Sequence, residues 1–301
     1  MNRTELTARL GRVGIWTRQL DMSPGMVAEQ AAAEIEALGW QTLWIPEAMH
    51  RDVLVHAALL LAATEHLVVA TGVARVHARG PQAMALTERH LNERFPGRLL
   101  LGLGVSHPFI VQRMLGQEYG PPVETMSTYL DAMDATRYGP APMPTDNGRV
   151  LAALGPKMLE LATRRAAGVH TYMAPVAHTA WAREQLGAAQ LLAPNLKVVL
   201  TNDPTEGLAI ARWSTSGTLK SPAYRSNLLR LGFAADDLDG DLADAVVHAL
   251  VAIDDEDTIA TRVHEHLAAG ADHVCIEVLT GDDTTVPMDA WRRLATLATL
   301  P

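Results

Sequence analysis

The sequence is poor in cysteine and in basic residues, and each shortage excludes a class of protein. Cys275 is the only cysteine among 301 residues, so a disulfide framework or a cysteine zinc site within the chain is excluded. Lysine and arginine number 25 against 34 aspartate and glutamate residues, which gives a formal net charge of −9. This acidic balance argues against nucleic acid or an anionic membrane surface as the partner.

Long apolar runs are also missing. No stretch reaches the roughly 18 apolar residues that a membrane helix needs, and the first 16 residues lack the apolar centre of a signal peptide. Hydrophobic residues make up 48% of the chain and charged residues 20%, as in ordinary globular proteins. We therefore expect a cytoplasmic protein that acts on a small molecule, with no nucleic-acid or membrane partner.

The chain alternates between strand-like and helix-like segments along its length. This alternation predicts a parallel α/β fold, and its count fits a (β/α)8 TIM barrel of one domain, residues 1–301, with insertions at about 138–149 and 204–270. The apolar strand candidates are 11–16, 42–45, 67–73, 98–104, 150–154, 168–173, 196–200 and 274–279.

A doubly wound open sheet is the alternative architecture. It would need a dinucleotide fingerprint, but Gly102 and Gly104 are followed by His107 where the third glycine of that motif belongs. The barrel is therefore the favoured fold.

Residues 98–108, RLLLGLGVSHP, carry the most informative strand end. Barrel enzymes build their sites from the loops that follow the strands, which makes His107 a candidate catalytic residue. An unperturbed imidazole pKa near ~6.5 suits both proton donation and proton acceptance. Glu47 and His50 follow another strand and are further catalytic candidates. The substrate-pocket candidates are Trp16, Trp44, Ser106 and Tyr172.

A metal centre is not expected. Barrel hydrolases often carry two histidines at the end of the first strand, where this chain has Gly14, Ile15 and Trp16. His264 and His266 are two positions apart on a predicted helix, so they point to different faces and cannot chelate one ion together.

Gly155, Pro156 and Lys157 lie at a strand-to-helix junction. Free amide groups at a helix start and a nearby lysine could bind a phosphate, although glycine and proline also serve as simple turn residues there. Together with the tryptophans, this motif predicts a pocket for a flat aromatic cofactor with a phosphate tail.

Several segments resemble the bacterial-luciferase-like flavin and deazaflavin oxidoreductases, most closely the coenzyme F420-dependent actinobacterial type. They are GWQTLWIPEA (39–48), VVATGVARVHARGP (68–81), FPGRLLLGLGVSHP (95–108), LAALGPKMLELATRRAAGVHTYM (151–173), LLRLGF (228–233) and AGADHVCIEVL (269–279). The resemblance implies a (β/α)8 barrel with insertions and F420 as the cofactor, with FMN as the alternative.

The resemblance also implies roles for individual residues. Gly72 and Val73 would form a bulge with a cis peptide that backs the cofactor ring, and Glu47 would bond the polar edge of that ring. Gly155, Pro156 and Lys157 would cradle the phosphate tail. The remaining cofactor-binding candidates are Arg75, Gly104, Val105, Leu154, His170 and Thr171.

The chain departs from the family pattern at two positions. Relatives that oxidise alcohols or sugar phosphates usually carry a histidine where this chain has Ala48, and several carry a glutamate where it has His107. Oxidation of those substrates by the known site patterns is therefore not expected, and His107 becomes the favoured proton donor or acceptor, with His50 as a substitute.

Three functions stay open at this point. The first is hydride transfer between F420 and an unidentified small organic substrate. The second is an FMN-dependent monooxygenase, and the third is a ligand-binding barrel subunit without turnover. We expect a homodimer, with the helix-rich insertion 204–270 as one source of apolar surface. The segments 106–122, 138–149 and 214–240 are expected to set the substrate.

Overall fold

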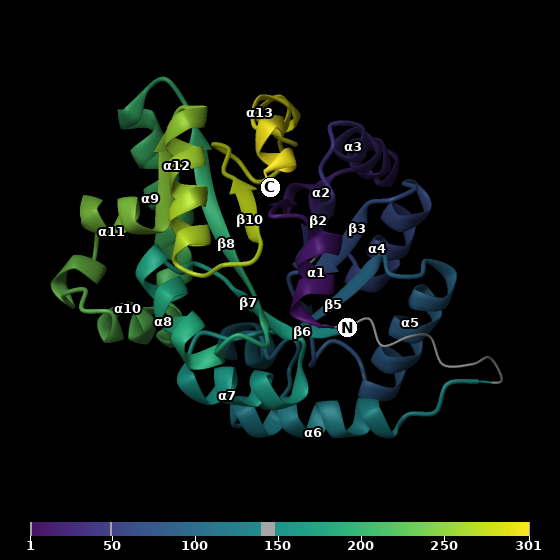
Figure 1. Cartoon of the computed structure of the whole chain (residues 1–301). Helices are drawn as coiled ribbons and strands as arrows, with labels where there is room; N and C mark the ends of the chain where they lie inside the picture. Colours follow the sequence, from purple (N-terminus) through teal and green to yellow (C-terminus); the bar gives the residue numbers. More distant parts are fainter. Residues whose placement is uncertain (1, 49, 140–147, 301) are drawn as a thin grey trace.

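The chain folds into a closed parallel β-barrel surrounded by helices (Figure 1). The structure is a computed structural model that describes residues 2–48, 50–139 and 148–300. Most of the predicted insertion 138–149 lies outside these ranges. The helices are α1 (Arg3–Leu10), α2 (Gln19–Met22), α3 (Gly25–Ala37), α4 (Val53–Ala62), α5 (Pro81–Arg94), α6 (Pro122–Ala135), α7 (Pro156–Arg165), α8 (Val176–Leu186), α9 (Pro204–Leu219), α10 (Pro222–Arg230), α11 (Asp244–Leu250), α12 (Glu256–Ala268) and α13 (Met288–Arg293).

Eight parallel strands close the barrel and confirm the predicted (β/α)8 fold. The order runs β10–β1–β2–β3–β5–β6–β7–β8, and pairing of β8 with β10 completes the ring. The strands are β1 (Val13–Trp16), β2 (Thr42–Ile45), β3 (Val68–Thr71), β4 (Ala74–Arg75), β5 (Leu99–Gly104), β6 (Arg149–Ala152), β7 (Gly168–Thr171), β8 (Leu191–Leu200), β9 (Val251–Asp254) and β10 (Val274–Val278).

Two strands lie outside the ring, and neither was expected as a separate strand. The short β4 pairs with the end of β5. The four residues of β9 pair in parallel with the last four residues of β8, Lys197–Leu200. The segment 204–270, which was expected to consist of helices, thus also contains a strand; its apolar part, Val251 to Ile253, is too short to separate by pattern from the helix α11 before it.

Local chemistry explains where many helices begin. Asp52 caps α4 by accepting hydrogen bonds from the amides of Leu54 at 2.9 Å and Val55 at 3.0 Å. Proline occupies the first turn of α5, α6, α7, α9 and α10, where its missing amide hydrogen is not needed.

The two faces of the barrel wall pack differently. Outward-facing side chains such as Ile15, Leu43 and Leu101 meet the surrounding helices in one large apolar core. Inward-facing side chains form a second cluster that Leu6 and Leu10 of α1 join at the end where the strands begin. That end is thus plugged, so the site must open at the other end, where the strands finish.

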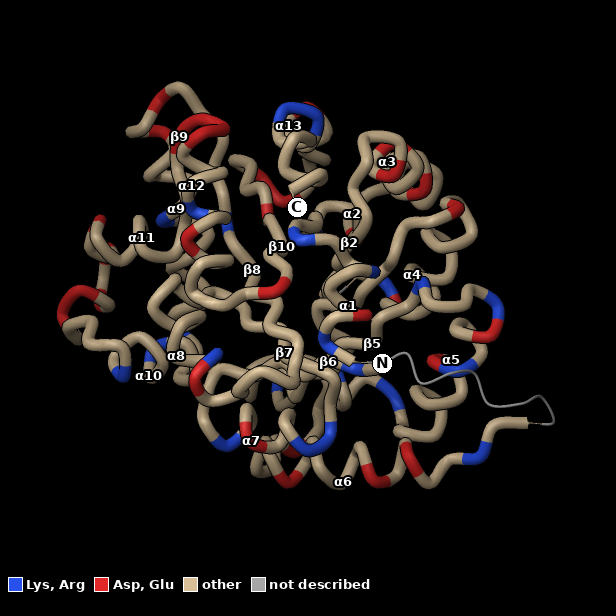
Figure 2. Tube along the Cα trace, viewed as in Figure 1, with Lys and Arg blue, Asp and Glu red and all other residues tan. Residues whose placement is uncertain are grey.

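Charged residues belong mainly to the outer helices and loops (Figure 2). Among the described residues, none of the helices is long and apolar enough to cross a membrane.

Candidate active site

A cavity of about 530 Å³ lies at the end of the barrel where the strands finish. Its lining confirms that residues after many different strands meet at one place, as a barrel requires. The lining residues are Trp16, Pro46, Glu47, Gly72, Val73, Arg75, Gly104, Val105, Ser106, His107, Pro108, Ile110, Tyr119, Pro122, Ala152, Ala153, Leu154, Gly155, Met158, His170, Tyr172, Ser221, Pro222, Ala223 and Tyr224.

Two glycines allow β3 and β5 to come close at the cavity floor. The peptide bond between Gly72 and Val73 is cis, as the resemblance implied. A Cβ atom on Gly104 would lie 2.5 Å from Cγ2 of Val73, and one on Gly72 would lie 2.6 Å from Nε1 of Trp16. Trp16 Nε1 donates a hydrogen bond to the carbonyl oxygen of Gly72 at 3.2 Å. Side chains at either glycine would therefore push these walls apart.

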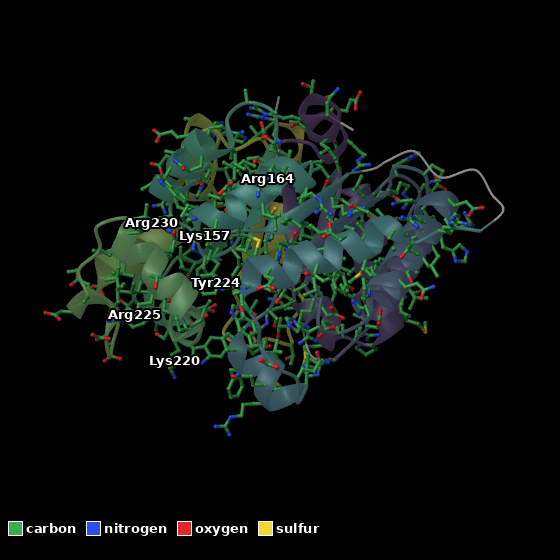
Figure 3. The ribbon with its side chains drawn as sticks, turned by 90° about the horizontal axis from the view of Figure 1, so that it is seen from below. Lys157, Arg164, Lys220, Tyr224, Arg225 and Arg230 are labelled. Carbon is green, nitrogen blue, oxygen red and sulfur yellow. The ribbon has the colours of Figure 1, made fainter. Side chains whose placement is uncertain are left out.

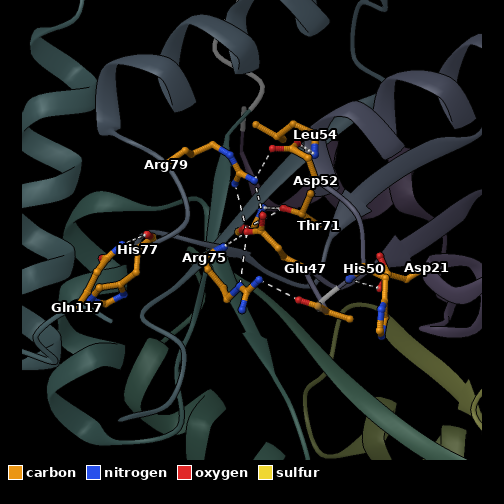
Figure 4. Close-up of polar contacts among 12 residues, drawn as sticks. Asp21, Glu47, His50, Asp52, Leu54, Thr71, Arg75, His77, Arg79 and Gln117 are labelled. Atoms are coloured by element: carbon orange, nitrogen blue, oxygen red, sulfur yellow. Dashed lines mark hydrogen bonds and ion pairs between the residues drawn. The ribbon is translucent and has the colours of Figure 1, made fainter. Parts of the chain in front are cut away.

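Glu47, which follows β2, is the centre of a charged cluster at one side of the cavity (Figure 4). One carboxylate oxygen accepts a hydrogen bond from the backbone amide of Arg75 at 2.6 Å, and the other accepts one from the Arg79 guanidinium. Arg79 also pairs with Asp52 at 2.9 Å. Hydrogen bonds and charge from Glu47 and Asp52 outweigh burial and raise the pKa of Arg79. Both oxygens of Glu47 are thus engaged, which favours a structure-holding role over that of a proton carrier.

His107 lies three residues after the end of β5 and borders the cavity. Ser106 before it has a φ of 61°, a left-handed conformation that turns the chain sharply at the strand end. The Nδ1 atom of His107 lies 3.3 Å from Oγ of Ser221, and its ring lies 5.6 Å from that of Tyr224. Burial lowers the pKa of His107 below its usual 6.5, so the ring is mainly neutral at pH 7.

His170 on β7 faces the same cavity from the barrel interior. Its Nδ1 atom is 2.9 Å from the carbonyl oxygen of Ala193 and must therefore carry the hydrogen. Burial lowers the pKa of His170 to about 4, so the ring is neutral and Nε2 is a bare acceptor. Nε2 is buried without a hydrogen-bond partner among the described residues.

A buried ion pair lies opposite the Glu47 cluster. Lys197 on β8 and Glu277 on β10 are paired across the two strands, and Nζ lies 3.5 Å from Oε1. Glu277 also accepts hydrogen bonds from the Tyr172 hydroxyl at 3.3 Å and from the Asn195 amide at 3.1 Å. Tyr172 is the member that reaches the cavity. Burial, the charge of Glu277 and that of Tyr224 raise the pKa of Tyr172, so its hydroxyl keeps its proton.

A second cavity of about 720 Å³ adjoins the first. The two share lining residues, among them His107, Tyr172, Ser221 and Tyr224. The second cavity lies between the 107–110 segment and the junction of α9 with α10, to which Lys220 and Tyr224 belong (Figure 3).

Most of the predicted site residues meet at the first cavity, but five do not line it. Trp44 lies beneath the cavity: side chains alternate along β2, and its ring points into the closed barrel, where it stacks on His170 at 4.7 Å and donates to Nε2 of His273 at 3.0 Å. Thr171 is fully buried beside the cavity, and His50, Pro156 and Lys157 are exposed. The proposed roles of these residues stay predictions.

Sequence reasoning missed Arg79, Tyr119, Ser221 and Tyr224, as well as Lys197. Tyr119 and the two residues from the α9–α10 junction fall in segments expected to set the substrate, so their region was predicted although their identity was not. Nothing in the sequence pairs Ser221 with His107, which lies 114 positions away. Among the described residues, no group of three histidine, cysteine, aspartate or glutamate side chains is arranged to hold a metal ion.

A family model described as luciferase-like monooxygenase matches residues 12–273. A protein of Mycobacterium tuberculosis, provisionally named as a coenzyme F420-dependent oxidoreductase, is 33% identical over 128 residues, which is 42% of this chain and 36% of that protein. The chain thus spans about a third of the length of this curated relative.

Solved structures share the fold over nearly the whole chain. An F420-dependent secondary alcohol dehydrogenase in complex with an F420–acetone adduct gives a TM-score of 0.74 at 14% identity, covering 95% of this chain and 98% of that one. The oxygenating constituent of 3,6-diketocamphane monooxygenase from Pseudomonas putida, in complex with FMN, gives 0.69 at 13% identity, with 96% of each chain covered. At these identities the likeness shows the fold alone.

Proposed function

Because this chain belongs to the luciferase-like monooxygenase family, we propose that it is an oxidoreductase that uses coenzyme F420 to transfer hydride to or from a small organic substrate. The observation that carries the proposal is the first cavity, of about 530 Å³, which can hold a flat ring. Two glycines, the neutral acceptor His170 and His107 all line it. The provisional name of the mycobacterial relative supports F420 as the cofactor.

The cavity residues fit a flat heteroaromatic ring. Gly72 and Gly104 add no side chain of their own to the cavity floor, and the partnerless Nε2 of His170 would accept a hydrogen bond from a ring N–H group. Trp16 and Tyr172, whose rings are 5.3 Å apart, would wall the same space. The bound cofactor would supply the hydride, and the barrel would hold it and exclude water.

His107 is the residue that would exchange a proton with the substrate. Glu47 is committed to Arg75 and Arg79, and His50 is exposed and outside the cavity lining. His107 borders both cavities, is mainly neutral at pH 7, and is held at Nδ1 by Ser221. This arrangement leaves Nε2 of His107 as the atom that would take up or release a proton on the substrate.

An FMN-dependent monooxygenase is the second candidate, since an FMN-bound monooxygenase shares the fold over 96% of both chains. Both functions need a flat ring with a phosphate tail in the same cavity, so geometry favours neither strongly. The chemistry at position 5 of the ring, a carbon in F420 and a nitrogen in FMN, is what separates them.

A fluorescence titration distinguishes these candidates. The protein is titrated into oxidised F420 and, in parallel, into FMN, and quenching gives the two dissociation constants. Tighter binding of F420 supports the proposal, whereas binding of FMN alone, followed by oxygen uptake with reduced FMN, would favour the monooxygenase. Binding of neither would leave a barrel subunit without turnover and would overturn the proposal.

The expected homodimer stays a prediction. Light scattering on the purified chain, coupled to size-exclusion chromatography, would give the mass directly. A mass equal to that of one chain at micromolar concentration would contradict it.

A further inference from the structure

We propose that the second cavity binds the substrate and that this substrate is an apolar, ring-bearing molecule with one carboxylate group. The reaction on this substrate rests on the proposed function, but binding to the cavity does not. The inference is carried by the walls of the cavity, by its charge and by its position next to His107.

The walls are mainly apolar and aromatic. Pro108, Phe109 and Ile110 form one side, and Tyr172 and Tyr224, whose rings meet edge to face at 6.2 Å, form another. Aromatic side chains bind flat apolar groups well. A polyol or a sugar phosphate would leave several hydroxyl groups without partners against such walls, at a large desolvation cost. The walls therefore select an apolar ring.

The charge of the lining selects the sign of the ligand. Lys220 is the one charged side chain that lines the cavity among the described residues, and the lining includes no carboxylate. It is exposed at the α9–α10 junction, whereas Lys157 comes from the start of α7 and does not line the cavity (Figure 3). An ammonium group at the rim of an apolar cavity favours a carboxylate on the ligand and disfavours a cation.

The position of His107 connects this cavity to the chemistry. His107 lines both cavities, so a molecule in the second cavity would contact it while a ring occupied the first. A substrate bound there would contact the proton carrier at the boundary between the two cavities, next to the cofactor ring. This is the placement that hydride and proton transfer to one double bond requires.

Calorimetric titration with two matched probes tests the inference on the full chain without cofactor. Cinnamate carries an apolar ring and a carboxylate, and cinnamamide has the same shape without the charge. We expect cinnamate to bind roughly threefold to fivefold more tightly, the scale of an exposed ion pair. Lys220→Met should remove this difference and leave cinnamamide binding unchanged, whereas the control Lys157→Met should preserve it.

Phe109 provides a test of where the probes bind. Because Phe109 is 67% exposed, the Phe109→Ser variant is expected to fold normally. This change should weaken both probes roughly fivefold through lost apolar contact. Unaltered binding of both probes in Phe109→Ser, or equal loss of the charge preference in Lys157→Met and Lys220→Met, would overturn the inference.

A separate titration of the same protein with F420 keeps the two proposals apart. Probe binding without cofactor binding would support this inference and contradict the proposed function. Cofactor binding with no affinity for either probe would overturn this inference alone.

Discussion

Two buried carboxylates lie on different strands of the barrel, one beside the cavity and one in the interior, and they are neutralised in different ways. Glu47 follows β2 and meets two arginines, one of which also pairs with Asp52, whose side chain is 47% exposed. Glu277 lies inside the barrel on β10, and the cation paired with it, Lys197, is 2% exposed. The Glu47 cluster borders solvent and contains two arginines. The Lys197–Glu277 pair, by contrast, is a single ion pair in the closed interior.

The difference shows what each site can tolerate. When one cation of the Glu47 cluster is lost, another cation and nearby water remain to stabilise the carboxylate. When Lys197 is lost, the hydrogen bonds left to Glu277 among the described residues come from neutral donors, Tyr172 and Asn195, in the buried interior. Removing one member of a fully buried pair is costly because the other charge stays desolvated.

The largest effect is therefore expected from Lys197→Met. It should lower the free energy of unfolding by about 3 to 5 kcal/mol, the scale for a broken buried ion pair. Urea denaturation followed by circular dichroism would measure this loss. The double variant Lys197→Met with Glu277→Gln should recover most of the stability, because no unpaired charge is left. If the unfolding free energy of Lys197→Met alone stayed within about 1 kcal/mol of the parent value, the buried ion pair would not be what distinguishes the two regions.

The next largest effect concerns the proton, which neither carboxylate is expected to carry. His107→Ala should cut turnover by roughly 100-fold or more while cofactor affinity stays within about tenfold. Because burial lowers the pKa of His107, the acid limb of the parent's pH profile should lie below pH 6.5 and should be missing in the variant. Unchanged turnover would return the role to Glu47, and Glu47→Gln should then show the larger loss.

A smaller effect is expected from Arg79→Ala in the Glu47 cluster. The variant should lose about 2 kcal/mol of stability, because Arg75 still faces the carboxylate of Glu47. Chemical denaturation gives the value, and Arg164→Ala, which breaks the exposed pair with Glu160, is the control with at most about 0.5 kcal/mol. If Arg79→Ala lost more stability than Lys197→Met, the Glu47 cluster would be the less tolerant of the two regions, contrary to expectation.

The smallest effect is a pH dependence that differs between neighbouring histidines on α12. Burial lowers the pKa of His266 to about 3, so only the unfolded chain binds a proton there when the pH falls below about 6.5. The stabilisation by neutral His266 is complete above pH 6.5 and is lost progressively as the pH falls toward 3. From pH 7 to pH 6, the free energy of unfolding should fall by about 0.7 kcal/mol because of this residue.

This pH dependence is measured as the change in unfolding free energy between pH 7 and pH 6. His266→Gln should reduce that change, whereas the exposed His264→Gln should leave it as in the parent. Equal slopes in all three proteins would contradict the assignment. Buried histidines with a pKa lowered to about 4, such as His170 and His273, add to the same trend on the Glu277 side of the barrel.

Local patterns were sufficient to predict much of this protein. Buried strands are encoded by short apolar segments, so the barrel was predicted from residues close in the chain. His107 was identified because it lies in the loop that follows a predicted strand. The family was also recognisable, since its motifs are short and keep their order.

What the sequence by itself determined is the order of strands and helices and the residues that their ends present. The tertiary structure alone decided that Arg79 engages Glu47, that Ser221 meets His107, and that Trp44 faces the barrel interior. It also decided that Lys197 lies opposite Glu277, 80 positions away, through the pairing of β8 with β10. The physical reason is that a side chain's partners depend on strand register and helix packing, which bring together residues with no local pattern in common.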